Sequence, residues 1–381
     1  MTDVLVTGVG AVTCQGYGAA ALQQAMTGAV APVPERIPDP GANLRHPLIL
    51  RVPGVAPGRG RAARLVTTAV SEALRDAGLE RRPWPGRVGV VIGSCMGEAM
   101  QHESGRCAED DDGAGWRPTF RLASAVGEWL GAFGVNTSIS NACAAGGFAL
   151  CLAADLIRSG EADMVISGGV DAYSRVGWAS FDRLGAIDPV RCRPFDRERR
   201  GTILAEGAGI LVLESGEHAR ERGAIGYGRI AGAGWSCDAH HLTAPEPTGE
   251  QIVRAMREAL GGSGEPGCVI PHGTGTRLND LVESRALRQV LGARTGEVPL
   301  YSAKALVGHT GGAAAALGAV AAALILRSGT VPQNVAIGEQ DPECEVYLPV
   351  SGPVRLRTPR VMVNAYAFGG NNASFVLEQA A

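Results

Sequence analysis

The chain has 381 residues, of which 45% are hydrophobic, and its formal net charge is −3 at pH 7. This length exceeds a single ordinary layered core, so we expect two domains or one duplicated domain. The small net charge gives the whole chain no pull toward nucleic acid or a membrane surface, which excludes proteins that bind through overall charge.

The cysteines and the N-terminal segment indicate a compartment. Nine scattered cysteines form no CxxC pair and no metal-ligand spacing with histidine, so we expect reduced thiols and no metal site. The segment MTDVLVTGVGAVT lacks the layout of a signal peptide, and no apolar run reaches about 18 residues without glycine or a charge. We therefore expect a cytoplasmic protein that does not span a membrane.

In the first half, apolar runs typical of strands alternate with helices whose apolar residues lie three and four apart. The expected strands are 3–13, 88–94, 164–170 and 207–215, and the expected helices are 18–27, 61–79 and 119–131. A Pro- and Arg-rich stretch at 32–60 and an acidic stretch at 95–116 have no clear periodicity.

The second half repeats this pattern. Its expected strands are 226–235, 268–273 and 298–303, and its expected helices are 248–260, 280–291 and one after VGHTGG. One helix in each half ends in RSG, and GAGILVLE in the first half parallels NNASFVLE in the second. These marks predict an internal duplication with halves 1–216 and 217–381. Alternating strands and helices predict an α/β sandwich with its active site where the halves meet.

The stretch from Val135 to Gly147, VNTSISNACAAGG, predicts a strand, a tight turn and the start of a helix. A cysteine in such a turn lies near the first helical N–H groups and the positive end of the helix dipole, which favour the thiolate. The same N–H groups suit an oxyanion on a bound thioester. Cys143 is thus either a nucleophile or a small buried hydrophobic residue, and this stretch alone does not decide.

Three more glycine-rich turns follow predicted strands, at 271–276 (PHGTGT), 304–312 (KALVGHTGG) and 364–372 (NAYAFGGNN). Glycines let such a backbone approach a ligand closely. Two of the seven histidines, His272 and His309, lie in these turns, although a single histidine is more often structural. Lys304 is the only lysine in the chain, and arginine does not replace a compact ammonium group.

Taken together, these motifs resemble those of a known family. NACAAG, HGTGT followed by Asp280, K-x-x-x-GH, and AFGGNN occur in the order seen in the β-ketoacyl carrier-protein synthases of the thiolase superfamily. RPFDRERRG and AEGAGILVLE extend the resemblance over nearly the whole chain. It implies an α/β thiolase-like fold, a duplicated five-layered αβαβα sandwich with two mixed sheets. FGGNN and YSRVGWASFDRLGAIDP are closer to synthases of polyene and type II polyketide pathways than to housekeeping fatty-acid enzymes.

The implied reaction is a decarboxylative condensation. Cys143 attacks an acyl thioester and holds the acyl chain covalently. The N–H groups of Cys143 and Phe368 form the oxyanion hole, and Phe368 also gates the acyl pocket. His272 and His309, with neutral rings, donate through Nε2 to the enolate that forms when a carrier-bound malonyl unit loses CO2.

The resemblance assigns the supporting residues as well. Lys304 orients the site and forms a buried ion pair with Glu283, so its loss would leave a carboxylate unpaired. Thr274 and Thr276 resemble the hydroxyls that hold the phosphopantetheine arm of the carrier. No cofactor beyond that arm is implied.

Three departures from the family pattern concern the substrate rather than the reaction. Ala367 replaces the glycine usual before the gating phenylalanine, which stiffens that loop. Asn371 replaces the usual threonine, and we place Ala367 and Asn371 among the substrate-binding residues. The acidic stretch 95–116 stands where acyl-pocket and dimer contacts usually lie.

The expected partner is an acyl carrier protein. Carriers are acidic, so Arg61, Arg64 and the run Arg191–Arg200 (RCRPFDRERR) are docking candidates, although an arginine run usually forms a solvated face. The resemblance also implies a homodimer, or a heterodimer with a chain-length-factor paralogue, and no nucleic-acid partner.

Two alternatives to condensation stay open. One is an acyltransferase that uses Cys143 without decarboxylation. The other is a non-catalytic scaffold or chain-length subunit, which the intact Cys143, His272 and His309 disfavour.

Overall fold

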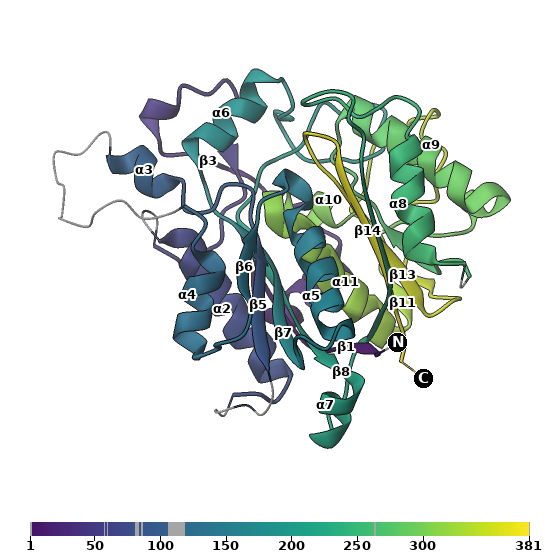
Figure 1. Ribbon diagram of the computed structural model, residues 1–381. Helices are drawn as coiled ribbons and strands as arrows, with labels where there is room; N and C mark the ends of the chain where they lie inside the picture. The colour runs from purple at the N-terminus through teal and green to yellow at the C-terminus, as the bar shows by residue number, and fades with distance from the viewer. Residues whose placement is uncertain are drawn as a thin grey trace.

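The computed structural model describes residues 2–56, 58, 60–80, 84, 87–105, 119–262 and 264–380. Helices and sheet alternate across the molecule in five layers, as expected from the sequence (Figure 1). One outer layer contains α2 (Arg61–Asp76) and α4 (Leu122–Leu130), and the opposite one contains α8 (Glu250–Leu260) and α9 (Arg277–Leu291). Helices α5 (Ala145–Arg158) and α11 (Ala314–Ser328) form the central layer (Figure 1).

The two halves of the chain build their sheets in the same order. The strands of the first half are β1 (Val4–Thr13), β5 (Val88–Gly93), β6 (Asn136–Ile139), β7 (Met164–Asp171) and β8 (Gly207–Ser215). Those of the second half are β9 (Gly228–Cys237), β10 (Cys268–Ile270), β13 (Arg360–Tyr366) and β14 (Asn371–Glu378). The orders are β6-β5-β7-β8-β1 and β10-β13-β14-β9. In the first half two parallel pairs are followed by two antiparallel pairs, and in the second half one parallel pair is followed by two antiparallel pairs. This repetition supports the duplication, while the boundary near residue 216 stays a prediction.

The two mixed sheets of the five-layered sandwich are joined to each other through β1 and β9. β1 and β9 run antiparallel and pair at Leu5–Arg229 and Val6–Gly228, so these nine strands form one hydrogen-bonded path. The short strand β2 (Gly16–Tyr17) pairs with β1 off this path and is the tenth strand of the sheet. The join is possible because position 228 has no side chain: a Cβ there would lie 2.3 Å from the carbonyl oxygen of Glu378.

The central helices are made of small and apolar residues, which allows them to pack closely between the strands. A Cβ at Gly146 of α5 would lie 2.5 Å from the Gly312 oxygen, so this glycine sets the closest approach of the two turns that precede the helices. Residues 311–328 are long and apolar enough to cross a membrane, but 78% of this segment is buried inside the protein.

Three predicted segments differ from the structure. Residues 298–303 form no regular strand, and only two isolated parallel bridges occur there, Val269–Leu300 and Pro299–Tyr347. Residues 175–183, for which no helix was expected, form α6 (Arg175–Arg183), whose N-cap Ser174 accepts a hydrogen bond from the Gly177 N–H. The acidic stretch contains α3 (Met100–Gly105), and its residues 106–116 lie outside the described residues.

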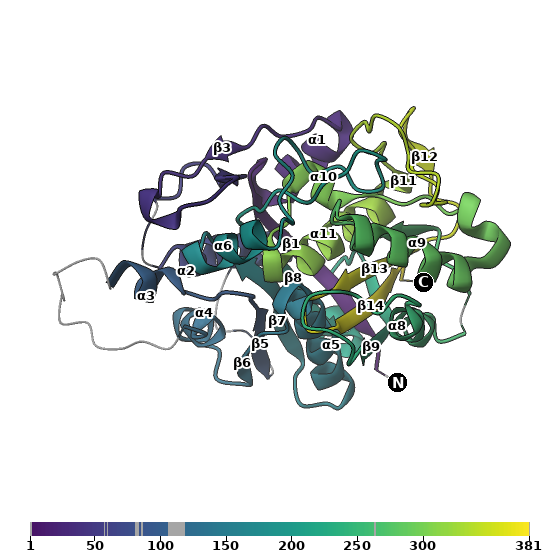
Figure 2. The same ribbon diagram turned by 90° about the horizontal axis from the view of Figure 1, so that it is seen from above.

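The remaining elements are short or peripheral. They are β2 (Gly16–Tyr17), α1 (Gly18–Gly28), β3 (Glu35–Arg36), β4 (Leu48–Ile49), α7 (Gly216–Glu221), α10 (Ala303–Val307), β11 (Thr330–Val331) and β12 (Val354–Arg355). Seen from above, β3 and α6 lie to the left of the central helices, and β11 and β12 lie to their right (Figure 2).

Candidate active site

Cys143 lies in a tight turn between β6 and α5, as the sequence predicts. It is the middle residue of a short 3-10 helix, Ala142–Ala144, that leads directly into α5. Ala142 has φ +45°, a left-handed conformation that costs a non-glycine residue energy and is typical of functional turns. The Cys143 side chain is 4% exposed.

A cavity of about 550 Å³ opens above this cysteine, and both halves of the chain contribute to it. The first half supplies Cys143 and Phe181, and the second half supplies His272, His309 and Phe368. The three glycine-rich turns that the sequence singled out therefore converge with the Cys143 turn on one cavity.

The two histidines lie close to the thiol. The Nε2 atom of His309 lies 3.2 Å from the Sγ atom of Cys143. The rings of His272 and His309 are 5.7 Å apart and nearly perpendicular. A thioester bound at Cys143 would therefore meet imidazole nitrogens from two different turns.

The cysteine is held as a thiol rather than as the thiolate that the helix start led us to expect. Burial raises the pKa of Cys143 to about 12, and this effect exceeds the opposing effect of the Lys304 charge. The charge of Asp171 raises the pKa further, whereas the N–H groups of Cys143 and Phe368, which face Sγ, lower it. The helix-start N–H groups thus act in the predicted direction, but desolvation is stronger.

Both histidines are held neutral. Burial, followed by the positive charge of Lys304, lowers the pKa of His272 and of His309 well below 6.5. For His272 the nearby His309 lowers the pKa further. Neutral rings agree with the expectation from the sequence.

Lys304 does not form the direct ion pair with Glu283 that we expected. Among the described residues, its Nζ donates to the backbone oxygen of His272 and lies 3.4 Å from His272 Nδ1. Glu283 instead accepts hydrogen bonds from the N–H groups of His272 and Gly273, both at 2.7 Å. The two charges act on the same turn from opposite sides, and the His272 backbone lies between them.

The position of Lys304 defines the tautomer of His272. An ammonium group has only donors, so the Nδ1 atom that faces it is the acceptor nitrogen. The ring proton of neutral His272 is therefore on Nε2. Burial lowers the pKa of Lys304, while the charge of Glu283 opposes that shift.

Asp171 is a residue of this site that the sequence analysis missed. It ends β7, is 3% exposed, and accepts hydrogen bonds from Ser94 Oγ and from the N–H groups of Cys95, Met96 and Gly312. It fixes the turn after β5 and the turn before α11. Its place at the end of a buried strand was the available signal.

The gating residue and its neighbours lie on the turn between β13 and β14. The Phe368 ring stacks on Phe181 with centroids 5.1 Å apart, and both rings line the cavity. Ala367 also lines the cavity, and its N–H donates to the Asn371 oxygen. Asn371 lies outside the lining residues, and its side-chain oxygen accepts a hydrogen bond from Asn141, two residues before Cys143.

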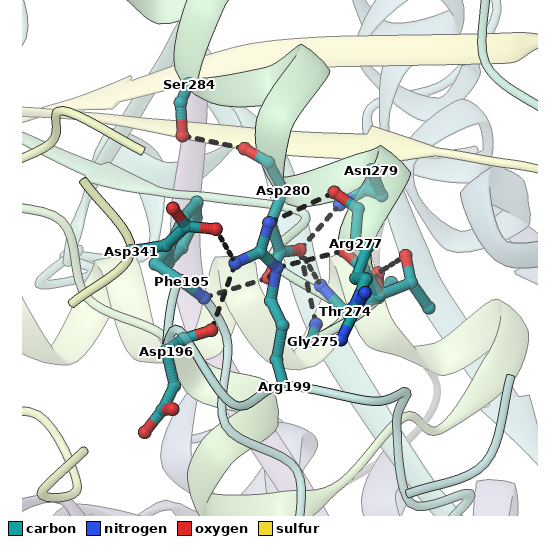
Figure 3. A network of polar contacts seen from close by, with 12 residues as sticks. Phe195, Asp196, Arg199, Thr274, Gly275, Arg277, Asn279, Asp280, Ser284 and Asp341 are labelled. Carbon is teal, nitrogen blue, oxygen red and sulfur yellow. Dashed lines mark hydrogen bonds and ion pairs between the residues drawn. The ribbon is translucent and has the colours of Figure 1, made fainter. Parts of the chain in front are cut away.

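Thr274 and Thr276 line the cavity, and their hydroxyl oxygens are 2.9 Å apart. Their turn is fixed by Asp280, whose carboxylate accepts from the N–H groups of Thr274 and Gly275 and from the Phe195 N–H. Arg199 lies against the same carboxylate and also binds Asp341 (Figure 3). The threonine hydroxyls are thus presented by a rigid turn.

The predicted docking arginines separate into buried and exposed ones. Arg61 is 4% exposed and forms an ion pair with buried Glu206 at 2.5 Å, so it is not available to a partner. Its role as a docking residue was a wrong prediction, because helix periodicity turns it toward the core. Arg64 is exposed. In the run Arg191–Arg200, Arg199 is buried in the network of Figure 3, whereas Arg197 and Arg200 are exposed.

No group of three or more His, Cys, Asp or Glu side chains is arranged to hold a metal ion in the described part of the chain. Eight of the cysteines lie in that part, and all eight are free thiols.

Comparison with known proteins defines the class. Residues 56–219 match the model of the β-ketoacyl synthase N-terminal domain, and residues 227–337 match that of the C-terminal domain. The chain therefore belongs to the β-ketoacyl synthase family, and its fold is the thiolase-like fold of these enzymes.

Individual relatives support this assignment. The chain is 35% identical over 347 residues to the tetracenomycin polyketide synthase ketoacyl synthase alpha subunit of Streptomyces glaucescens, covering 83% of this chain and 80% of that protein. It is 33% identical over 340 residues to 3-oxoacyl-[acyl-carrier-protein] synthase 2 of Synechocystis sp., covering 84% and 82%. A solved complex of a type II polyketide synthase acyl-carrier protein with its ketosynthase, bound to a hexaketide, matches with a TM-score of 0.91 and 27% identity over 100% of both chains.

Proposed function

We propose that this protein is a β-ketoacyl synthase that condenses a carrier-bound malonyl unit with an acyl group held on Cys143, in a type II polyketide, polyene or fatty-acid-like pathway. The observation that carries the proposal is the meeting of Cys143, His272 and His309 in one cavity, with His309 Nε2 at 3.2 Å from Sγ. Family membership and the polyketide and fatty-acid relatives support it.

The first step transfers the acyl group to Cys143. Because the thiol has a pKa of about 12, it must lose its proton as it attacks, and His309 Nε2 is within hydrogen-bond distance to accept it. The bond from Sγ to the acyl carbon forms, the bond to the carrier sulfur breaks, and the departing thiolate takes up the proton. The N–H groups of Cys143 and Phe368 stabilise the oxyanion.

The second step uses the histidines as donors. When the malonyl carboxylate leaves as CO2, the enolate oxygen accepts hydrogen bonds from the Nε2–H groups of His272 and His309. The carbanion then attacks the acyl carbon, the bond to Sγ breaks, and Cys143 regains a proton from solvent. Condensation therefore consumes one proton for each CO2 released.

His309 has to accept in the first step and donate in the second. Its Nδ1 atom has no hydrogen-bond partner among the described residues, so no group fixes its tautomer. In contrast, Lys304 fixes His272 as a donor through Nε2. We assign proton exchange with the thiol to His309 and enolate stabilisation to both rings, with Lys304 and Glu283 as positioning residues.

The substrate comes on an acyl carrier protein. The solved complex with a carrier is similar over the full chain, and Thr274 and Thr276 are suited to hold the phosphopantetheine arm. Phe368 serves as the gate, Ala367 borders the acyl pocket, and Asn371 acts through Asn141. We propose that the arm is the only cofactor-like group required, that the protein is cytoplasmic and dimeric, and that its halves are residues 1–216 and 217–381.

Intact-protein mass measurement tests this function. Wild-type protein incubated with an acyl carrier thioester should gain the mass of one acyl group on Cys143. Adding malonyl carrier should then release CO2 and a product two carbons longer. An adduct without extension would favour plain acyl transfer, and the lack of any adduct would leave only a scaffold or chain-length role.

A further inference from the structure

Two arginines lie on the cavity: Arg200, the last member of the predicted docking run, and Arg277, which the sequence analysis did not single out. Arg200 and Arg277 both belong to its lining, and both are exposed. Among the described residues, neither guanidinium forms a hydrogen bond or an ion pair. The cavity also contains the carboxylate of Asp238, but this group is engaged by the Asn372 side chain and the Glu246 N–H. The positive charge of the two arginines is therefore not neutralised locally.

A buried network holds the backbones of these arginines together. The Gly201 N–H donates to the Gly275 oxygen at 2.9 Å, which joins the loop after Arg200 to the loop before Arg277. The Arg199 guanidinium donates to the backbone oxygens of Thr276 and Arg277 and is anchored by Asp341 (Figure 3). Arg199 is thus buried and structural, while its neighbour Arg200 and the clamped Arg277 are left free for a ligand.

The two ends of the cavity carry different chemical groups. Its buried end holds Cys143, His272 and His309, which are 4%, 4% and 1% exposed. Thr274 and Thr276 follow, and the exposed Arg200 and Arg277 lie next to Thr276 along the two joined loops. A substrate whose thioester reaches Cys143 places its other end at the arginines. Two free guanidinium groups match a phosphate, because each offers a fork of donors and a permanent charge.

From this arrangement we infer that Arg200 and Arg277 bind the phosphodiester at the outer end of the phosphopantetheine arm. This inference rests on the proposed function. Arg200 and Arg277 thus take the role in carrier binding that the sequence predicted for Arg61. Within the run Arg191–Arg200, this role falls to Arg200, the exposed member that lines the cavity.

Thioesters with and without the phosphate test the site directly. Acylation of Cys143 is followed by intact mass, using hexanoyl-phosphopantetheine and hexanoyl-pantetheine as donors, and the ratio of their kcat/KM values is the readout. Wild type should favour the phosphorylated donor by about 100-fold, about tenfold for each arginine. The ratio should approach one in the Arg200→Glu/Arg277→Glu double variant, and it should fall with added salt in wild type.

Matched variants separate binding from folding. Arg357→Glu makes the same charge change at an exposed arginine outside the cavity lining, and it should keep the wild-type ratio. Arg200→Gln/Arg277→Gln removes the charge without reversing it and should also lower the ratio. Unfolding midpoints should stay unchanged, since neither arginine has a described partner to lose.

Other outcomes overturn the inference. A kcat/KM ratio near one in wild type, or a double variant that keeps the wild-type ratio, would show that the arginines do not bind the phosphate. A double variant impaired only with the intact carrier would mean that they contact acidic side chains of the carrier instead. No adduct from any donor in wild type would overturn the proposed function and this site with it, whereas an adduct with a ratio of one overturns this site alone.

Discussion

The turn that carries Cys143 and the turn that precedes α11 have the same backbone conformation but carry different side chains. In each, a short 3-10 helix, Ala142–Ala144 or Gly311–Ala313, leads directly into a buried central helix. The middle residue is Cys143 in the first and Gly312 in the second. Gly312 is needed because a Cβ there would lie 2.7 Å from the Cys95 nitrogen. The second turn instead contributes His309, which lies just before its 3-10 helix.

The turns after β5 and β10 are a second pair of equivalent turns, one from each half of the chain. Two residues past each strand end lie Cys95 in the first half and His272 in the second. A buried carboxylate accepts the backbone N–H groups of each turn, Asp171 in the first and Glu283 in the second. Duplication thus supplies two equivalent scaffolds, and the chemistry is divided between them: the nucleophile in one half and both imidazoles in the other.

Replacement of the nucleophile should have the largest effect. Cys143→Ala should lower condensation on the order of 10³-fold or more, because no acyl group can be held covalently. Cys95→Ala, at the position that corresponds to His272, should retain the adduct and most of the activity, since Cys95 does not line the cavity. Intact mass and product formation measure both, and an adduct on Cys143→Ala would disprove the assignment.

The buried ion pair of the first half should matter for stability rather than docking. Arg61→Ala leaves the Glu206 carboxylate unpaired and should lower the free energy of unfolding by about 3–5 kcal/mol. Arg64→Ala, one helical turn further on and exposed, should change it by less than about 0.5 kcal/mol. Denaturant unfolding compares them, and equal values would contradict the buried role of Arg61.

Asp171 and Glu283, the carboxylates that hold the two turns, should differ in how much each contributes to the free energy of unfolding. Both oxygens of Asp171 accept two bonds each, so Asp171→Asn turns two donors toward an amide NH₂ and should cost about 2–5 kcal/mol of unfolding free energy. Each oxygen of Glu283 accepts one backbone bond, so Glu283→Gln should cost about half as much. A larger loss for Glu283→Gln in the same unfolding experiment would reverse the ranking.

The reactivity of Cys143 should follow its raised pKa. Since only the thiolate is alkylated and the pKa is about 12, the rate with iodoacetamide should rise about tenfold per pH unit between about pH 7 and 10, without a plateau. Asp171→Asn removes a charge that raises this pKa and should speed alkylation, whereas Lys304→Met removes one that lowers it and should slow alkylation. A plateau below pH 9 in wild type would refute the raised pKa.

The smallest effect is expected at the gate. Ala367→Gly should lower the free energy of unfolding by about 0.4–1 kcal/mol, because glycine gives the unfolded chain more freedom. Its condensation rate should stay within about twofold, since the N–H of residue 367 still donates to Asn371. A loss of stability above about 2 kcal/mol would mean that the alanine methyl group contributes packing as well.

Local patterns were sufficient for the elements and for the membership of the site. Strand periodicity placed β1, β5, β7 and β8 to within about one residue, and glycine-rich turns located His272, His309 and Phe368, because turn geometry depends on nearby residues. Lys304 was found as the only lysine. Residues 298–303 do not form a strand although their apolar composition is typical of one, because they pair with their neighbours only through isolated bridges at Pro299 and Leu300.

The protonation state of Cys143 and the burial and partners of the charged side chains depend on the tertiary structure alone. The sequence determined that a cysteine stands at a helix start beside two histidine-bearing turns, and that the fold is a duplicated α/β sandwich. It did not determine that burial keeps Cys143 protonated, that Arg61 points inward to Glu206, or that the His272 backbone separates Lys304 from Glu283. Each of these depends on desolvation and on partners more than 10 residues away, which no local pattern encodes. The same packing that hides Arg61 and Arg199 leaves Arg200 and Arg277 free on the cavity.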